Sequence, residues 1–242
     1  MKKLIFILIV FCLCFAGVAA AKDACKYGEG DLKTIDGIMV ERATDQPANG
    51  LICAYDGLIY RTASLKNGRL EGIAQNYDEK GKLKEEVSFK NGELEGIVRG
   101  YYENGNLRGE GYNKNGELEG IVRGYYENGA LQEESSFRNG KQEGMTRTYY
   151  ENGNLASVSP YKNGKKEGIV TIYHGNGTLG GEFTYENGKR EGIMKRYTEE
   201  GDFWGKILYR NDKAVSGACA NGRAFTNAEL INWQNGHEVI CN

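Results

Sequence analysis

The glutamate of a recurring Glu-Gly pair is the residue best suited to chemistry, because neighbouring carboxylates can share a proton or hold a metal ion. It occurs six times at a spacing of 24 residues, at Glu71, Glu95, Glu119, Glu143, Glu167 and Glu191. If each unit contributes two β-strands about 4.8 Å apart, neighbouring carboxylates lie about 10 Å apart. That is too far for a shared proton or one metal ion, so we expect these side chains to bind solvent or turns.

The cysteines are the second candidate group. Those that remain after removal of a predicted signal peptide are Cys25, Cys53, Cys219 and Cys241. An even number in an exported chain predicts disulfide bonds, and four cysteines allow three pairings. A zinc site is the weaker alternative, because there is no Cys-x-x-Cys and the two histidines are His174 and His237. A catalytic Cys–His pair would need His237 beside Cys219 or Cys241.

Other catalytic signatures do not occur in the sequence. It has no phosphate-binding loop, dinucleotide-binding fingerprint or serine nucleophile elbow. We therefore predict a protein that is not an enzyme and uses neither a cofactor nor a metal. The formal net charge of −2 becomes −4 when Lys2 and Lys3 are removed (−2 minus 2), and both signs are interspersed. Without a basic block, nucleic acid is a poor partner.

Residues 1–21 have the pattern of a signal peptide. Lys2 and Lys3 precede the uncharged apolar run Leu4–Val18, and Ala19-Ala20-Ala21 supplies a small-residue cleavage site. An uncleaved anchor is the alternative, but the run is short for a membrane span. The cysteines near this segment do not lie in a sequence resembling a lipobox. The sequence therefore predicts export, to the periplasm or the extracellular space.

The 24-residue period runs through residues 66–209. The six copies start at Lys66, Lys90, Lys114, Arg138, Lys162 and Glu186, without insertion or deletion. A fixed period of this length marks a repeat architecture in which each unit stacks on its neighbours. Residues 22–65 and 210–242 lose the register. We predict them to be an N-terminal cap with a degenerate copy near residues 49–59, and a C-terminal cap.

Each copy has the pattern of an antiparallel hairpin. The stretch Ile97–Tyr102 alternates with a period of two, as strands do. Asn104-Gly105 predicts the turn into a second strand, Leu107–Tyr112, because Asn and Gly tolerate the positive φ of hairpin turns. Asn115-Gly116 then leads into the next copy. The sequence predicts an all-β fold: an elongated single-layer antiparallel sheet of tandem 24-residue β-hairpin repeats with disulfide-bearing caps.

The apolar residues that recur in every copy are expected to stack into a core stripe. Their positions are those of Ile97, Tyr101 and Leu107. The stripe tyrosines predicted to be largely buried are Tyr101, Tyr125, Tyr149 and Tyr173. The aromatic residue that ends the other copies is Asn113 in the second copy, preceded by Tyr112, and a local bulge would restore the face there.

These motifs resemble MORN repeats in their bacterial variant form, over residues 66–209. The matching segments are Tyr-Tyr-Glu-Asn-Gly-Asn-Leu at residues 101–107 and Lys-Asn-Gly-Glu-Leu-Glu-Gly at residues 114–120. The resemblance implies a twisted, elongated, single-layer β-sheet and a role in association with proteins or membrane surfaces. Some bacterial relatives belong to an antitoxin-like group.

The resemblance also bears on the pairing of the cysteines. Six copies of two strands hold the caps about 55 Å apart, at about 4.8 Å per strand. A disulfide needs its Cα atoms within about 7 Å. Bonds between the caps would require the sheet to close into a ring, which open MORN-like arrays are not expected to do. That leaves Cys25–Cys53 and Cys219–Cys241.

Three functional classes fit this chain. We favour an exported scaffold that associates with a protein partner or with the envelope. Contact with a membrane surface or with the cell wall remains an alternative. A cell-wall or carbohydrate binder is the second class, although such repeats normally carry a Trp each and the array holds only Trp204. An antitoxin or immunity-like inhibitor is the third. The candidate contact patch is Tyr102, Tyr126 and Tyr150, which alternation points away from the stripe; a cap or second apolar layer covering them is the alternative.

Overall fold

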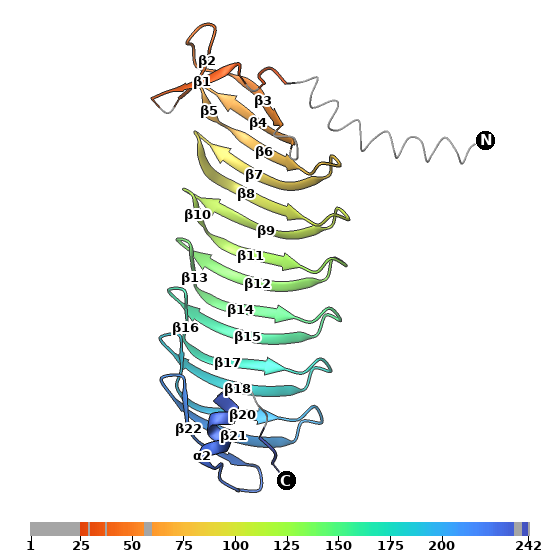
Figure 1. Cartoon of the computed structure of the whole chain (residues 1–242), viewed down its shortest axis with the longest axis vertical. Coiled ribbons are helices and arrows are strands. Elements are labelled where there is room, and N and C mark those ends of the chain that lie inside the picture. The colour runs from red at the N-terminus through yellow and green to blue at the C-terminus, as the bar shows by residue number, and fades with distance from the viewer. Residues whose placement is uncertain (1–24, 29, 37, 56–59, 235–238, 242) are drawn as a thin grey trace, which may run out of the picture. The chain divides into compact units, whose positions relative to one another are not determined.

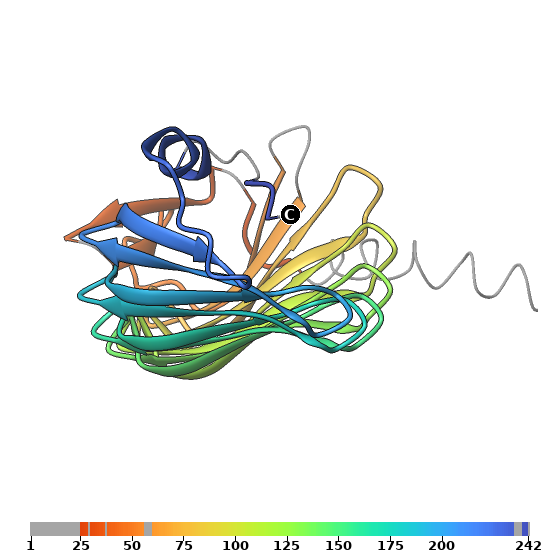
Figure 2. The same ribbon diagram turned by 90° about the horizontal axis from the view of Figure 1, so that it is seen from below.

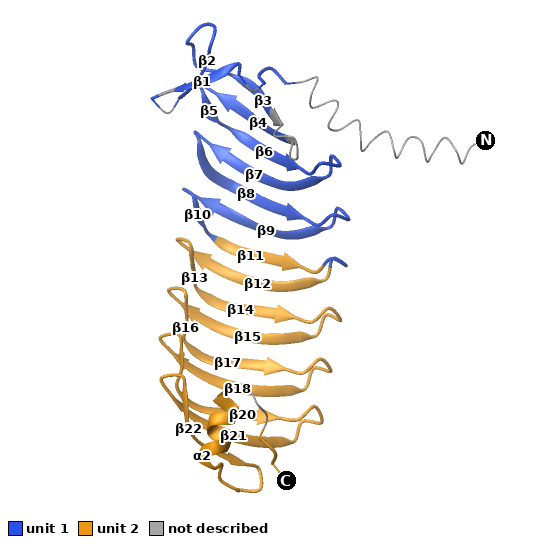
Figure 3. Ribbon diagram, viewed as in Figure 1, with its two compact units in different colours: residues 1–119, 127–129 blue, residues 120–126, 130–242 orange. Residues whose placement is uncertain are grey.

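The structure is a computed structural model that describes residues 25–28, 30–36, 38–55, 60–234 and 239–241. The predicted signal peptide, residues 1–21, lies outside the described residues. Backbone contacts divide the chain into two compact units (Figure 3). Unit 1 comprises residues 1–119 and 127–129, and unit 2 comprises residues 120–126 and 130–242. No helix within the described ranges has the length and apolar character to cross a membrane.

Unit 1 is built from antiparallel strands, labelled in Figure 1. They are β1 (Leu32–Ile35), β2 (Ile38–Glu41), β3 (Gly50–Tyr55), β4 (Tyr60–Lys66), β5 (Arg69–Leu70), β6 (Gly72–Tyr77), β7 (Leu83–Lys90), β8 (Glu93–Tyr101), β9 (Leu107–Lys114) and β10 (Glu117–Leu118). The sheet runs β3-β4-β6-β7-β8-β9. β1 and β2 pair separately. The predicted degenerate copy corresponds to the hairpin of β3 and β4, which continues the sheet.

Unit 2 repeats the same scheme and adds a helix. Its elements are β11 (Gly120–Tyr125), β12 (Leu131–Arg138), β13 (Lys141–Gln142), β14 (Gly144–Tyr149), β15 (Leu155–Lys162), β16 (Lys165–Lys166), β17 (Gly168–Tyr173), β18 (Leu179–Glu186), β19 (Lys189–Arg190), β20 (Gly192–Tyr197), β21 (Phe203–Arg210), β22 (Lys213–Cys219) and α2 (Asn227–Gln234). The sheet runs β11-β12-β14-β15-β17-β18-β20-β21-β22. The predicted all-β fold of tandem antiparallel hairpins is confirmed.

Two kinds of turn alternate along the chain. Asn91 and Gly92, between repeats, both have positive φ (53° and 89°), as do the equivalent pairs, which is the signature of a type I′ turn. In the loop at residues 103–106, within a repeat, only Gly105 has positive φ (89°), and its N–H donates to the Tyr102 carbonyl (2.9 Å). The Asn-Gly signal thus predicts both turns, but the second is a three-residue loop ending in a left-handed glycine.

Each sheet has two different faces. In the end-on view of Figure 2 the strands of each unit bend along their length, which gives each sheet a concave face. We call this the inner face; it carries Val87 and Phe89 in unit 1 and Ile207 and Tyr209 in unit 2. The outer face carries the alternate residues. A bulge at the loop end of each hairpin, as between Gly100 and Tyr101, shifts the register there.

The prediction that the recurring isoleucines form a core is wrong. They lie on the outer face and are 42% exposed at Ile97 and 57% exposed at Ile169. The stripe tyrosines, among them Tyr101 and Tyr149, are half-buried rather than largely buried. Successive side chains of a strand point to opposite faces, so a period of two does not indicate which face is buried. Nothing in the described part of the chain covers the outer face.

Asn113 keeps its place in the register, so the predicted local bulge is wrong. It pairs with Gly96 as Phe137 pairs with Gly120 in the next copy. Asn113 is therefore an inner-face residue, only 9% exposed, whereas Tyr112 is exposed on the outer face. The sequence break changes the chemistry of the inner face and leaves the backbone unchanged.

The densest packing lies at the caps. Tyr27, Ala48 and Leu65 form a core in unit 1, and a larger one in unit 2 joins Ile207 and Tyr209 to residues of the C-terminal segment. The predicted disulfides are confirmed: Cys25 pairs with Cys53 (Cα–Cα 5.9 Å) and Cys219 with Cys241 (5.5 Å). Each bond closes a loop within one unit.

Candidate functional site

The recurring glutamates tie each repeat to the next. Glu71, Glu95, Glu143, Glu167 and Glu191 each accept a hydrogen bond from the backbone N–H of the asparagine that begins the following type I′ turn. The pairs are Asn91 with Glu71 (2.9 Å), Asn115 with Glu95 (2.7 Å), Asn163 with Glu143 (2.9 Å), Asn187 with Glu167 (2.7 Å) and Asn211 with Glu191 (2.9 Å). The prediction that these carboxylates bind turns is confirmed, and their recurrence has a structural cause.

The hairpin loops carry a second set of bonds between repeats. Asn152 and Asn154 both donate from Nδ2 to the Gly175 carbonyl of the next loop (2.9 and 2.8 Å). Asn176 donates in the same way to the Glu199 carbonyl (2.9 Å). The asparagine of the Asn-Gly motif therefore serves the contact between loops as well as the turn itself.

The candidate patch tyrosines belong to this framework. Tyr102 lies in unit 1 and Tyr126 and Tyr150 in unit 2, and all three are half-buried. The Tyr126 hydroxyl donates to the Tyr149 carbonyl and the Tyr150 hydroxyl to the Tyr173 carbonyl, each at 2.7 Å. Tyr126 and Tyr150 are thereby held against the next repeat, which gives them a structural role beside the predicted contact role.

Charged side chains of the outer face are paired with one another. Arg123 contacts Glu134 at 2.9 Å, and Lys195 contacts Glu182 at 3.1 Å. The Tyr101 hydroxyl donates to Glu86 (2.8 Å), and its partial burial together with that carboxylate raises the pKa of Tyr101. Exposed pairs of this kind contribute little to stability.

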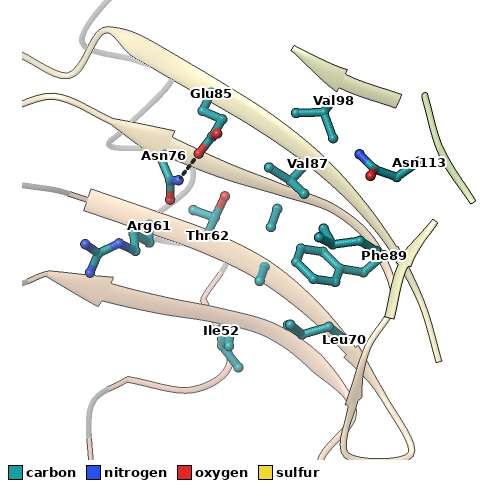
Figure 4. Close-up of a pocket in the computed structure, with 13 residues that line it drawn as sticks. Ile52, Arg61, Thr62, Leu70, Asn76, Glu85, Val87, Phe89, Val98 and Asn113 are labelled. Atoms are coloured by element: carbon teal, nitrogen blue, oxygen red, sulfur yellow. Dashed lines mark hydrogen bonds between the residues drawn. The ribbon is translucent and has the colours of Figure 1, made fainter. Parts of the chain in front are cut away.

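An apolar hollow in the inner face of unit 1 is a candidate binding site (Figure 4). Its volume is about 580 Å³, within the range of pockets that bind small ligands or anchor side chains. The apolar residues that line it are Ile52, Ala63, Leu70, Ala74, Val87, Phe89, Leu94 and Val98. They come from β3 to β8, so several hairpins and the cap together form one surface.

Polar groups lie at the ends of this hollow. Asn76 donates from Nδ2 to Glu85 at 2.8 Å (Figure 4). Thr62 is only 5% exposed, Arg61 is exposed, and Asn113 lies toward the opposite end from Arg61. An apolar floor with a few polar groups at its margin suits an amphipathic ligand.

The candidate catalytic cysteines are occupied in a disulfide bond. Cys219 and Cys241 are bonded to each other, and His237 lies outside the described residues. Within the described ranges, no three His, Cys, Asp or Glu side chains gather closely enough to hold a metal ion. His174 lies in a loop, with Nε2 3.0 Å from the Tyr197 carbonyl. It occupies the position of Tyr150 one repeat later.

The residues of the hollow were not among those predicted from the sequence. A signal for them does exist at the position of Val87, which is followed at intervals of 24 residues by Gly111, Ser135, Ser159, Phe183 and Ile207. Side chains at this position are large and apolar in the first copy and in the last two, and small in between. This variation in size indicates where the hollow lies, provided that one knows which residues face inward.

The fold and its bonding pattern define a tandem β-hairpin repeat protein. A family model described as the MORN repeat variant matches four consecutive segments of the chain, residues 70–91, 94–117, 118–139 and 142–163. Residues 70–163 are therefore MORN repeats, as the resemblance predicts. A search of curated proteins returned no similar sequence.

Proposed function

We propose that the protein is an exported, non-enzymatic MORN repeat protein that acts as an interaction scaffold for a protein partner. One observation carries the proposal: the recurring glutamates and loop tyrosines bind the neighbouring copy, whereas the inner-face residue at the position of Val87 differs from copy to copy. A framework of constant bonds that presents a variable concave surface is how repeat proteins achieve specific recognition.

Export is supported by the two disulfides and by the predicted signal peptide. Cys25–Cys53 and Cys219–Cys241 would persist in the periplasm or outside the cell and would be rare in a reducing cytosol. The caps that they close protect the ends of the sheet, where unpaired strand edges invite aggregation.

A non-enzymatic role is supported by how the titratable groups are used. The recurring carboxylates accept backbone hydrogen bonds, and the outer carboxylates Glu134 and Glu182 pair with basic side chains. The Asn76–Glu85 bond at the hollow joins two side chains of one hairpin. Groups arranged in this way orient a framework or a bound partner.

The proposal is tested by capture from envelope extract with the mature, oxidised chain as bait. The prediction is a defined protein partner, retained at physiological salt and identified by mass spectrometry. A scrambled-sequence bait of equal composition would not fold and is a poor control, so the matched control is the bait with reduced and alkylated cysteines. Equal recovery of the same proteins by both baits would contradict a specific scaffold.

A carbohydrate-binding role is a second candidate, supported by aromatic side chains on the inner face of unit 2. Phe137, Tyr161 and Tyr185 recur there at one per repeat and are half-buried. Burial raises the pKa of both tyrosines. Co-sedimentation with insoluble peptidoglycan, lost on Tyr161→Ala and retained in an outer-face variant, would favour this role. Absence of co-sedimentation would favour the protein scaffold.

A further inference from the structure

The chain itself shows what kind of element covers its inner face. In unit 2, α2 lies over the last strands of the sheet (Figure 1), and its Leu230 is buried against Met194 and Ile207. Trp233, one helical turn later, donates from Nε1 to the Tyr209 hydroxyl (2.7 Å). Met194, Ile207 and Tyr209 are no more than 2% exposed, so the helix seals this part of the inner face.

The helix is stabilised independently of that contact. Thr226 and Glu229 form a capping box, in which the Thr226 N–H donates to Glu229 (2.8 Å) and the Glu229 N–H donates to the Thr226 hydroxyl (3.2 Å). An eight-residue helix is marginal alone in water. The cap and the Cys219–Cys241 bond therefore hold α2 in place over the sheet.

The inner-face residues beneath α2 form an apolar floor, and the 24-residue period places a floor of the same kind in unit 1. Ile207 corresponds to Val87, Tyr209 to Phe89 and Met194 to Ala74, each five copies earlier. Val87, Phe89 and Ala74 all line the hollow of about 580 Å³. The hollow is thus the counterpart, in sequence register, of the floor beneath α2.

The intervening copies continue this apolar floor only in part. Ser135 and Ser159 take the place of Ile207, and Thr146 takes the place of Met194, whereas Val122 and Val170 at that position stay apolar. Thr146 donates to the Ser135 hydroxyl (3.2 Å), and Ser135 donates to Glu133. A polar network of this kind offers no site for an apolar anchor, so the hollow of unit 1 is a local feature and not a property of every repeat.

We propose that the hollow of unit 1 binds an amphipathic helix of a protein partner, seated as α2 is seated in unit 2. Its anchors would be an aliphatic and an aromatic side chain three residues apart on one face, as Leu230 and Trp233 are. Recognition of this type places an apolar helix face in a groove and leaves the polar face in water. The inference rests on the proposed scaffold role and names the class of partner.

The floor also sets which aromatic anchor it accepts. In unit 2 the Tyr209 hydroxyl accepts a hydrogen bond from the indole N–H of Trp233. Phe89, at the equivalent position in unit 1, has no hydroxyl. A tryptophan in the hollow would leave its N–H without that acceptor, which is unfavourable for a buried polar group. Leu70 takes the place of Arg190, which lies over Tyr209 in unit 2. The hollow therefore prefers phenylalanine to tryptophan as its aromatic anchor.

The test uses two fluorescein-labelled, hydrocarbon-stapled helical peptides: residues 226–234 of this chain, and the same segment with Trp233→Phe. Anisotropy titrations use the full mature chain with its disulfides intact. We expect saturable binding of both, with the Phe peptide at least about fivefold tighter, the low end of the effect of an unpaired buried N–H. Phe89→Tyr should abolish or reverse this preference, and it preserves the size of the floor.

Position controls complete the experiment. Val87→Glu should weaken binding at least tenfold, while Ile97→Glu, on the outer face of the neighbouring strand, should leave it unchanged; thermal melts establish that both variants are folded. Binding that survives Val87→Glu, or a preference that ignores Phe89→Tyr, would overturn the proposal. So would saturable binding of dodecanoate with no binding of either peptide, which would make the hollow a lipid site. If envelope extract yields a partner whose binding survives Val87→Glu, the scaffold role stands and this inference fails.

Discussion

Glu167→Ala isolates the bond that we hold responsible for joining successive repeats. The Glu167 carboxylate accepts a hydrogen bond from the N–H of Asn187 (2.7 Å), which lies in the turn that begins the next copy. Hydrogen bonds to charged groups contribute about 1.5–3 kcal/mol net. Glu167 is half-buried and Asn187 is exposed, so water replaces part of the lost bond. We therefore expect a loss of about 1 kcal/mol from the contact between these two copies.

Amide hydrogen exchange measured by NMR provides the assay. A loss of about 1 kcal/mol corresponds to roughly fivefold faster exchange, since 1.36 kcal/mol is tenfold. The Asn187 amide should show this change, and the Asn163 amide, held by Glu143 one copy earlier, should not. Glu186→Ala is the matched control, because it removes an exposed carboxylate next to the same turn.

Two results would refute this reasoning. Equal acceleration at Asn163 and Asn187 would mean that Glu167→Ala weakens the whole unit and not one contact. An equal effect of Glu186→Ala at Asn187 would mean that the net charge of the turn matters and the hydrogen bond does not.

Three further predictions concern the loops and the C-terminal cap. Tyr150→Phe should lower the free energy of unfolding by about 1 kcal/mol in urea titrations, because one hydrogen bond is lost without loss of packing; an unchanged midpoint would show the bond to be dispensable. The Arg223 guanidinium and the Thr226 N–H hold the pKa of Glu229 at about 2, below the value of 4.5 of an unperturbed Glu. Its stabilising effect is present above pH 4.5 and is lost between pH 4.5 and about 2, so Glu229→Gln should remove stability at neutral pH and nearly none at pH 2; melts at both pH values measure the difference. The double substitution Cys219→Ser and Cys241→Ser should lower the free energy of unfolding by about 2–4 kcal/mol. It should also shift tryptophan emission to the red, because both tryptophans of the chain pack at this cap. Unchanged emission would contradict that packing.

Most of the fold can be predicted from the sequence, because turns and periodicity are local properties. Asn and Gly at fixed intervals determine where strands end, as at Asn91-Gly92. The expected strand spacing, together with the open array that the resemblance implies, predicts the disulfide pairing. These inferences need only strand spacing and the positive φ that each turn requires.

The assignment of faces cannot be predicted in the same way. Ile97 and Val98 are equally apolar, yet Ile97 is exposed and Val98 lines the hollow. Which face is concave depends on strand bending and on the caps, and a period of two contains no information on either. Asn113 shows the same limit, since the sequence suggests a bulge whereas the polar side chain is accommodated in register. The hollow was missed because it follows from the concave face.

Site-specific photo-crosslinking gives the most direct test of the central claim, that the inner face of unit 1 receives the partner. A photoreactive benzoyl-phenylalanine is placed at Ala74, which lines the hollow, or at Gln75, the next residue on the same strand, which bonds Glu86 on the outer face. Both variants are irradiated in envelope extract with disulfides intact. We predict that a single protein partner crosslinks from position 74 and not from position 75. Crosslinking from position 75 alone, or equally from both, would contradict the account.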